Sequence, residues 1–105
     1  MFRNLFFSKN SSKRLYLLLE YLESKWSIKV REEFEIKFNN CIEIIKSMPE
    51  SFPKLQNDAI RHKCVVTKQT TVLYKFNSKE IVIIAVFDSR QDKTRKILKK
   101  YSYMK

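Results

Sequence analysis

Hydrophobic positions change their spacing along the chain, and these changes predict its elements. Residues 2–7 form a short aromatic stretch that is expected to be a strand, and it ends at Ser8, a residue type that caps helices. From position 9 to about 25, leucines recur three and four residues apart, which predicts an amphipathic helix. The same spacing resumes after Ser27 and continues to Pro49, where a second helix must end. The pattern therefore predicts a strand followed by a helical hairpin.

After a connector that contains Pro49 and Pro53, the period changes from helical to two, as is typical of strands. One face of the first such strand is expected to carry Ile60, His62, Cys64 and Val66. The other face is expected to carry Arg61, Lys63 and Val65.

Two further strands are predicted. Val72, Tyr74 and Phe76 alternate with Leu73 and Lys75. The dipeptide 77–78, Asn followed by Ser, predicts a tight turn, because Asn tolerates left-handed backbone conformations. Residues 81–87 are apolar on both faces, which predicts the central strand of a sheet. Residues 91–100 are predicted to be a short basic helix or tail.

The order strand, helix, helix, strand, strand, strand predicts a small α+β fold in one domain that spans residues 1–105. We expect an antiparallel sheet with the two-helix hairpin packed on one face. The opposite face would then be a shallow basic surface that carries Arg61, Lys63 and Lys75.

The amino-acid composition excludes some classes of function. The chain contains no glycine, which excludes the Gly-rich phosphate loops of nucleotide-binding enzymes. The longest apolar run is the seven residues 81–87, and the first residues do not resemble a secretion signal. We therefore expect a cytoplasmic protein that does not enter the membrane.

Positive charge is concentrated in the second half of the chain. From Lys54 onward there are thirteen basic and four acidic residues, whereas the formal net charge of the whole chain is +11. Such an asymmetry favours a polyanionic or acidic partner.

The residues that could carry other chemistry have simpler interpretations. Cys41 and Cys64 are expected to be reduced core residues, although the sequence leaves open whether they pair. With a single histidine they cannot complete a four-ligand zinc site, and no cofactor is expected. His62 shares its face with apolar residues, so we expect it to be packed. Asp88 and Asp92 lie beside basic residues and are expected to form ion pairs rather than to bind metal.

Several segments, taken together and in order, resemble the RelE/ParE toxin superfamily. They are residues 21–26 (YLESKW), the connector 49–53, residues 60–63 (IRHK) with Tyr74, and residues 83–92, which contain FDSRQD. The resemblance spans nearly the whole chain. It implies the fold inferred above and the toxin of a bacterial type II toxin–antitoxin pair, held inactive by a cognate acidic antitoxin.

Members of this superfamily act in two ways, and the resemblance implies different site residues for each. RelE-like toxins cut messenger RNA on the ribosome without metal, and Arg61, Lys63 and Arg90 would then supply the catalytic cations. A Tyr or His expected shortly after the last arginine is missing from residues 92–96, and Tyr101 is a weak candidate for proton transfer. ParE-like toxins instead poison DNA gyrase. The missing group and the long hairpin favour a ParE-like inhibitor.

Whichever the target, a basic surface is expected to bind it. The candidate residues for binding the target or nucleic acid are Arg61, Lys63, Lys75, Arg90, Lys93, Arg95 and Lys96. Such a surface would bind nucleic acid with a steep salt dependence, and it would suit an acidic antitoxin equally well. A third possibility is a basic RNA-binding module without toxicity.

Overall fold

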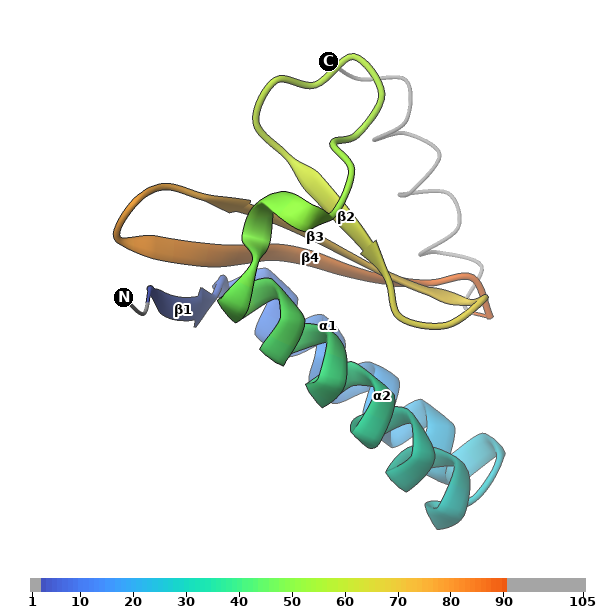
Figure 1. Ribbon diagram of the computed structural model, residues 1–105. Coiled ribbons are helices and arrows are strands. Elements are labelled where there is room, and N and C mark those ends of the chain that lie inside the picture. Colours follow the sequence, from blue (N-terminus) through green and yellow to red (C-terminus); the bar gives the residue numbers. More distant parts are fainter. Residues whose placement is uncertain (1–2, 91–105) are drawn as a thin grey trace.

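The computed structural model describes residues 3–90. Two α-helices, α1 (Lys9–Lys25) and α2 (Ile28–Ser47), form a hairpin. The strands are β1 (Asn4–Phe7), β2 (His62–Val65), β3 (Thr70–Phe76) and β4 (Glu80–Asp88), and a short 3₁₀ helix, η1 (Pro49–Ser51), follows α2. Both helices lie on one side of the sheet (Figure 1). The predicted α+β class and the order of elements are confirmed.

Both helices begin at serine caps, as predicted. The Ser8 hydroxyl accepts a hydrogen bond from the backbone N–H of Ser11, and the Ser27 hydroxyl accepts one from Val30. Each bond satisfies an N–H group that the first helical turn leaves without a partner. Pro49 lies two residues after the end of α2 and starts η1, as expected of a residue that cannot continue an α-helix. Residues next to each helix therefore determine where α1 and α2 begin and where α2 ends.

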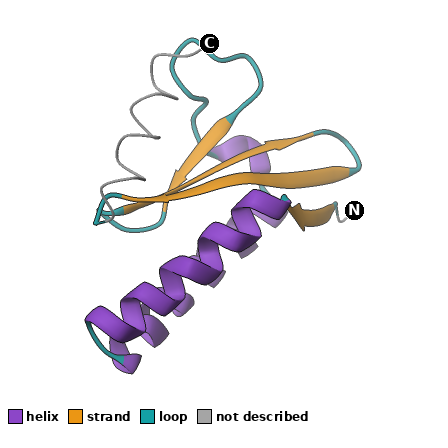
Figure 2. Ribbon diagram, turned by 180° about the vertical axis from the view of Figure 1, so that it is seen from behind, coloured by secondary structure: helices purple, strands orange, loops and turns teal. Residues whose placement is uncertain are grey.

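The sheet has the strand order β1-β4-β3-β2, so β4 is central, as predicted from its two apolar faces. The expectation of a wholly antiparallel sheet is wrong in one place, because β1 pairs with β4 in parallel. Parallel neighbours need a long connection, and here the helical hairpin and the other strands provide it. Figure 2 shows the same arrangement from behind, with the hairpin under the sheet. Side-chain alternation cannot reveal the direction of a strand whose partner is more than seventy residues away.

A register shift interrupts the pairing of β3 with β4. Leu73 is opposite Ala85, whereas Tyr74 is opposite Ile83, so Ile84 has no direct partner. Two serines occupy this point: the Ser8 hydroxyl donates to the carbonyl of Ile84 (3.0 Å), and the buried Ser11 hydroxyl donates to that of Ile83 (2.9 Å). The serines satisfy carbonyl groups near the bulge. They also fix the start of α1 against the central strand.

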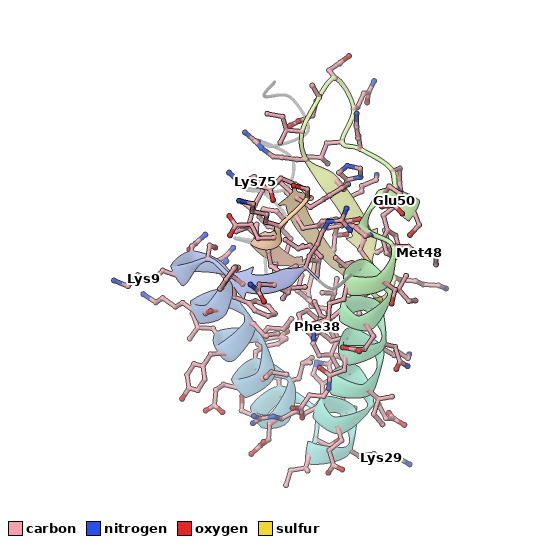
Figure 3. All side chains as sticks on the ribbon, turned by 60° about the vertical axis from the view of Figure 1, so that its left-hand side comes forward. Lys9, Lys29, Phe38, Met48, Glu50 and Lys75 are labelled. Atoms are coloured by element: carbon pink, nitrogen blue, oxygen red, sulfur yellow. The ribbon has the colours of Figure 1, made fainter. Side chains whose placement is uncertain are left out.

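Apolar side chains form a main core between the sheet and the hairpin and a second cluster on the other face of the sheet. Leu18 and Leu22 from α1, and Phe38 and Ile45 from α2, pack against strand residues such as Ile83. Figure 3 shows Phe38 pointing from α2 toward α1. The second cluster contains Leu73, Ala85 and Phe87, with Leu55 and Ile84 packed against it. It accounts for the apolar character of β4 on both faces.

Two local predictions need correction. Ile60 was expected to share the buried face of the second predicted strand, but it is 63% exposed and β2 begins only at His62. The Asp58 carboxylate accepts the N–H groups of Ile60 and Arg61, which forms a turn instead of extended strand. Asn77 does mark a turn, but it acts through its side chain, which accepts from the N–H groups of Lys79 and Glu80. Within residues 3–90, the non-glycine residue with positive φ is Asn57 (59°).

Candidate functional site

The face of the sheet away from the helices carries exposed lysines beside the second apolar cluster. His62 and Cys64 are buried toward the hairpin, so Lys63 between them points to the opposite face. Lys63 of β2 pairs in register with Leu73 of β3, and Lys75 lies two residues after Leu73 in β3. Both lysines are exposed, and Figure 3 shows where Lys75 lies on the sheet. The surface that carries Lys63 and Lys75, above the buried Leu73 and Ala85, is called the outer face below.

Arg61 directly precedes β2 and is partly restrained. Its Nε lies 3.6 Å from a carboxylate oxygen of Asp58, and its side chain is about one third exposed (34%). Hydrogen bonds from the backbone N–H groups of Arg61 and Ile60 lower the pKa of Asp58, and the charge of Arg61 adds to this effect. Asp58 therefore remains ionised and holds Arg61 near the start of β2.

Arg90 is held much more tightly. Its Nε and one Nη donate to the two carboxylate oxygens of Asp88, at 3.0 and 2.7 Å, which is the bidentate geometry that suits guanidinium. Asp88 is 1% exposed and also accepts hydrogen bonds from the Thr70 hydroxyl (2.6 Å) and the Arg90 backbone N–H (2.9 Å). Burial tends to raise the pKa of Asp88, but the hydrogen bonds from Arg90 and Thr70 outweigh it and keep the pKa below its usual value. The expected ion pairing of Asp88 is confirmed.

The structure separates Arg90 from the outer face, contrary to the expected common surface. The Arg90 carbonyl accepts a hydrogen bond from the Tyr21 hydroxyl of α1 (3.5 Å). Its side chain borders a polar cavity of about 140 Å³, together with Glu33 and Lys37 of α2. Arg90 thus lies on the side of the hairpin, whereas Lys63 and Lys75 lie on the other side of the sheet. The strand pattern could not reveal this, because Arg90 follows the end of β4.

His62 is packed, as predicted. It is 7% exposed, and its ring lies 5.4 Å from the Tyr74 ring and 5.1 Å from the Phe76 ring. Its Nδ1 is 2.7 Å from the carbonyl oxygen of Phe52. Because a carbonyl can only accept, Nδ1 carries a proton. The Tyr74 hydroxyl donates to the Pro49 carbonyl on the same side. Both groups that could transfer a proton near β2 therefore face away from Lys63 and Lys75.

Residues 3–90 contain neither a metal-binding cluster nor a helix able to span a membrane. Among residues 3–90, no three His, Cys, Asp or Glu side chains are grouped so that they could hold a metal ion. No helix in this part is both long and apolar enough to cross a bilayer. The remaining predicted site residues, Lys93, Arg95, Lys96 and Tyr101, lie outside the described residues, as do Asp92 and the predicted basic helix or tail.

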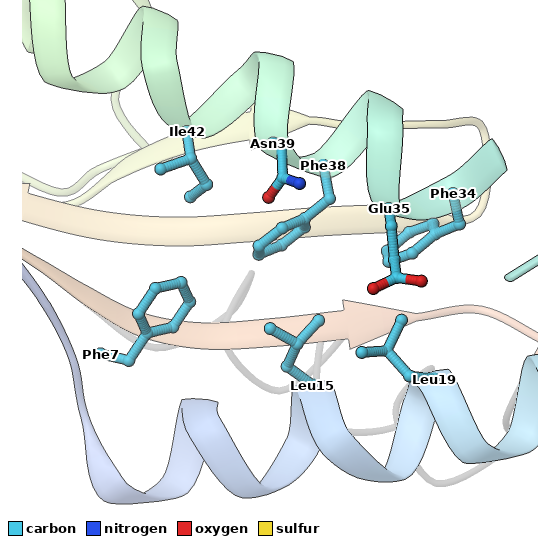
Figure 4. A pocket seen from close by; sticks show the side chains of 8 residues that line it. All are labelled: Phe7, Leu15, Leu19, Phe34, Glu35, Phe38, Asn39 and Ile42. Carbon is cyan, nitrogen blue, oxygen red and sulfur yellow. The ribbon is translucent and has the colours of Figure 1, made fainter. Parts of the chain in front are cut away.

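A second surface was not anticipated from the sequence. An apolar groove of about 260 Å³ lies where β1 meets the two helices. Figure 4 shows Phe7 of β1, Leu15 and Leu19 of α1, and Phe34 and Phe38 of α2 pointing toward one another around it. Glu35 and Asn39 are also part of its lining. The helical spacing predicted these apolar residues as core, and nothing in that spacing distinguishes a filled core from an open groove.

The chain has the fold of the RelE/ParE-type toxins, which confirms the expected fold. It superimposes on a chain of the chromosomal ParDE toxin–antitoxin system of P. aeruginosa with a TM-score of 0.68 and 7% identity, over 82% of this chain and 95% of that one. A chain of the E. coli DinJ-YafQ toxin–antitoxin complex matches with a TM-score of 0.60 and 14% identity, over 84% and 93%.

A third similar structure is the YoeB dimer from Staphylococcus aureus, with a TM-score of 0.57 and 16% identity, over 79% of this chain and 92% of that one. No protein-family model matches the sequence, and no curated protein matches it significantly. At these identities the structural matches establish the fold, whereas activity must be argued from the residues.

Proposed function

We propose that this chain is the toxin of a type II toxin–antitoxin pair and that it inhibits growth in the ParE-like manner, by acting on DNA gyrase. The fold carries this proposal, because matches to chains of two toxin–antitoxin assemblies cover more than 90% of those chains. The neighbours include both ParE-type and RelE-type proteins, so the fold does not select the target.

The arrangement of charges supports the ParE-like mode. Metal-free RNA cleavage needs cations and a proton-transfer group around one phosphate. Here Lys63 and Lys75 share one face, Arg90 is engaged by Asp88 on the other side, and His62 and Tyr74 are packed toward the hairpin. The alternative is a RelE-like ribosome-dependent nuclease in which Arg61 and Lys63 contact the RNA, with Tyr101 as its weak candidate for proton transfer.

The outer face and the groove together fit an acidic antitoxin. Exposed Lys63 and Lys75 would attract its carboxylates, and the groove beside Phe7 and Phe38 could take apolar side chains. The toxin proposal therefore includes a partner that is both acidic and amphipathic.

Induction of the chain alone in bacteria, followed by pulse labelling of DNA and protein synthesis, tests the proposal. DNA damage with filamentation is the expected result. Immediate arrest of translation with cuts in ribosome-bound messenger RNA would replace the gyrase target with the RelE-like one. Normal growth with abundant folded protein would overturn the toxin proposal and favour the non-toxic RNA-binding alternative.

A charge-reversal pair tests the outer face. Lys63→Glu with Lys75→Glu is expected to reduce growth inhibition at least tenfold, measured as surviving colonies after induction, because a repulsive charge replaces an attractive one. The matched control is Lys9→Glu with Lys29→Glu. Both of these lysines are exposed in the first turn of a helix, where a carboxylate is favourable. Equal toxicity of the two double variants would remove the outer face from the proposal.

A further inference from the structure

A cavity of about 210 Å³ lies at one end of the outer face, where the turn between β3 and β4 meets the connector that precedes β2. The turn is the end of the orange hairpin at the left of Figure 1. The cavity is separate from the apolar groove that the two helices line. Its lining comes from both segments and consists of Ile60, Lys75, Phe76, Asn77, Glu80 and Val82.

The register of the strands determines how this cavity is built. Lys75 and Val82 are direct partners, so their side chains lie side by side, and Glu80 shares their face because it lies two residues before Val82. Ile60 is largely exposed, and the Asp58 carboxylate fixes the turn that presents it. The cavity therefore combines two aliphatic side chains with one cation and one carboxylate.

The polar groups of the cavity retain most of their hydrogen-bonding capacity. The Asn77 Oδ1 accepts from two backbone N–H groups of the turn, which leaves its side-chain NH₂ group as a donor. Within residues 3–90, no ion pair or hydrogen bond engages the Lys75 ammonium or the Glu80 carboxylate, although both side chains line the cavity. The cavity thus presents a donor, an acceptor and a cation to a ligand.

We propose that this cavity binds the guanine base of a nucleotide. The flat ring lies against Ile60 and Val82, as bases do against apolar side chains in other pockets. Guanine carries two adjacent donors, N1–H and the exocyclic amino group, which both reach the Glu80 carboxylate. Its O6 accepts from the Asn77 amide, and the phosphate of the nucleotide meets Lys75.

The Glu80 carboxylate provides the selectivity. Adenine and cytosine present one donor beside an unprotonated ring nitrogen, and uracil presents one donor between two carbonyl groups, so each places a lone pair against a carboxylate. A surface that attracts only phosphates or acidic side chains gains nothing from Glu80, because its charge opposes them. A carboxylate beside Lys75 and the exposed Lys79 instead suits a ligand that joins an anionic phosphate to a base with two donors. This inference does not depend on the target proposed above.

A free nucleotide and a guanine within a single strand offer the same chemistry, and one titration separates them. The purified full chain is titrated with the 5′-monophosphates of guanosine, adenosine, cytidine and uridine, and with short single-stranded oligonucleotides that contain one guanine or none. Backbone amide shifts in NMR spectra measure the affinity and locate the site. Guanosine monophosphate should bind roughly tenfold more tightly than the other three, with shifts centred on residues 60 and 75–82. Tighter binding of the guanine oligonucleotide would identify a strand as the ligand, and equal affinity would identify the free nucleotide.

Two matched variants test the contact that selects guanine. Glu80→Gln keeps the size of the side chain but replaces one acceptor with a donor, so the preference for guanine should fall to about twofold or less. Glu32→Gln removes the same charge from an exposed position of α2 and should keep the full preference. Both positions are exposed, and the amide spectra of the free variants report whether each is folded.

Three outcomes would overturn the proposal. They are equal affinity for the four mononucleotides, a guanine preference that survives in folded Glu80→Gln, and the absence of shifts at millimolar nucleotide. Each is measured on the purified chain, so it leaves the growth inhibition of the toxin proposal untouched. Conversely, normal growth on induction would not remove a guanine preference seen in the titration.

Discussion

Two arginines near the sheet are each paired with an aspartate, but the pairs differ in depth and geometry. Arg90 makes two hydrogen bonds to Asp88, which is buried and further bound by Thr70. The Arg61 Nε approaches a carboxylate oxygen of Asp58 at 3.6 Å, and the Arg61 side chain is more exposed than that of Arg90. In the sequence both arginines appear as candidate site cations. The Asp58 side chain is itself only 9% exposed, so the pairs differ chiefly in geometry: two short hydrogen bonds hold Arg90 in the scaffold, whereas the looser contact leaves Arg61 nearer the surface.

The largest expected effect is on the deeper pair. Arg90→Ala removes the positive charge and two of the four hydrogen bonds that the buried Asp88 carboxylate accepts, so the free energy of unfolding should fall by about 2 to 4 kcal/mol, as measured by urea denaturation. Loss of toxicity in this variant would then reflect loss of folded protein. A decrease below about 0.5 kcal/mol would contradict the structural role of Arg90.

The second largest expected effect is the loss of stability when acid protonates Asp88 and weakens its pair with Arg90. The folded-state pKa of Asp88 is lowered, so its stabilising contribution is complete above its unfolded-state pKa, about 3.9, and is lost as the pH falls through the folded-state pKa. We expect the urea midpoint of the wild type to decrease as the pH drops below about 5. Asp88→Asn should have lower stability near neutral pH and a flatter acid dependence. Parallel pH profiles for the two proteins would contradict this assignment.

The smallest expected effect is on the shallow pair. Arg61→Ala should lower the free energy of unfolding by less than about 1 kcal/mol, because the pair is partly exposed and screened by solvent. The same urea titration measures it, and Arg61→Lys serves as a control that keeps the charge. A loss as large as that of Arg90→Ala would remove the distinction between the pairs.

Much of the fold was predictable because the sequence specifies it locally. Serine caps, helical leucine spacing and the proline after α2 define the hairpin, and period two defines β2 and β3. The direction of β1 was not predictable, because it depends on pairing with β4 across most of the chain. Ile60 was assigned to a strand because its spacing matches His62, whereas hydrogen bonds to Asp58 determine the backbone there.

Less of the candidate site was predictable. Alternation placed Lys63 and Lys75 on one face and His62 on the other, and the structure agrees. Arg90 was assigned to the wrong side of the sheet, because it lies beyond the end of β4, where strand alternation no longer applies. Its ion pair with Asp88 depends on the burial of the Asp88 carboxylate, which the sequence does not show. The groove beside Phe7 was not predictable, because apolar spacing indicates that side chains are buried without showing whether the space between them is filled.

The parallel pairing of β1 with β4 has a consequence for synthesis of the chain. Asn4 pairs with Glu80, and Phe7 with Ile83, so among the described strands β1 is joined to the sheet only by β4. While the chain emerges from the ribosome, the hairpin can form from local contacts. β1 can join the sheet only after β4 has been made, because β4 lies between β1 and β3. The sheet, including its outer face, is completed only after β4 has been synthesised, so a nascent chain that stops before β4 lacks the finished surface on which we propose that its inhibitory activity depends.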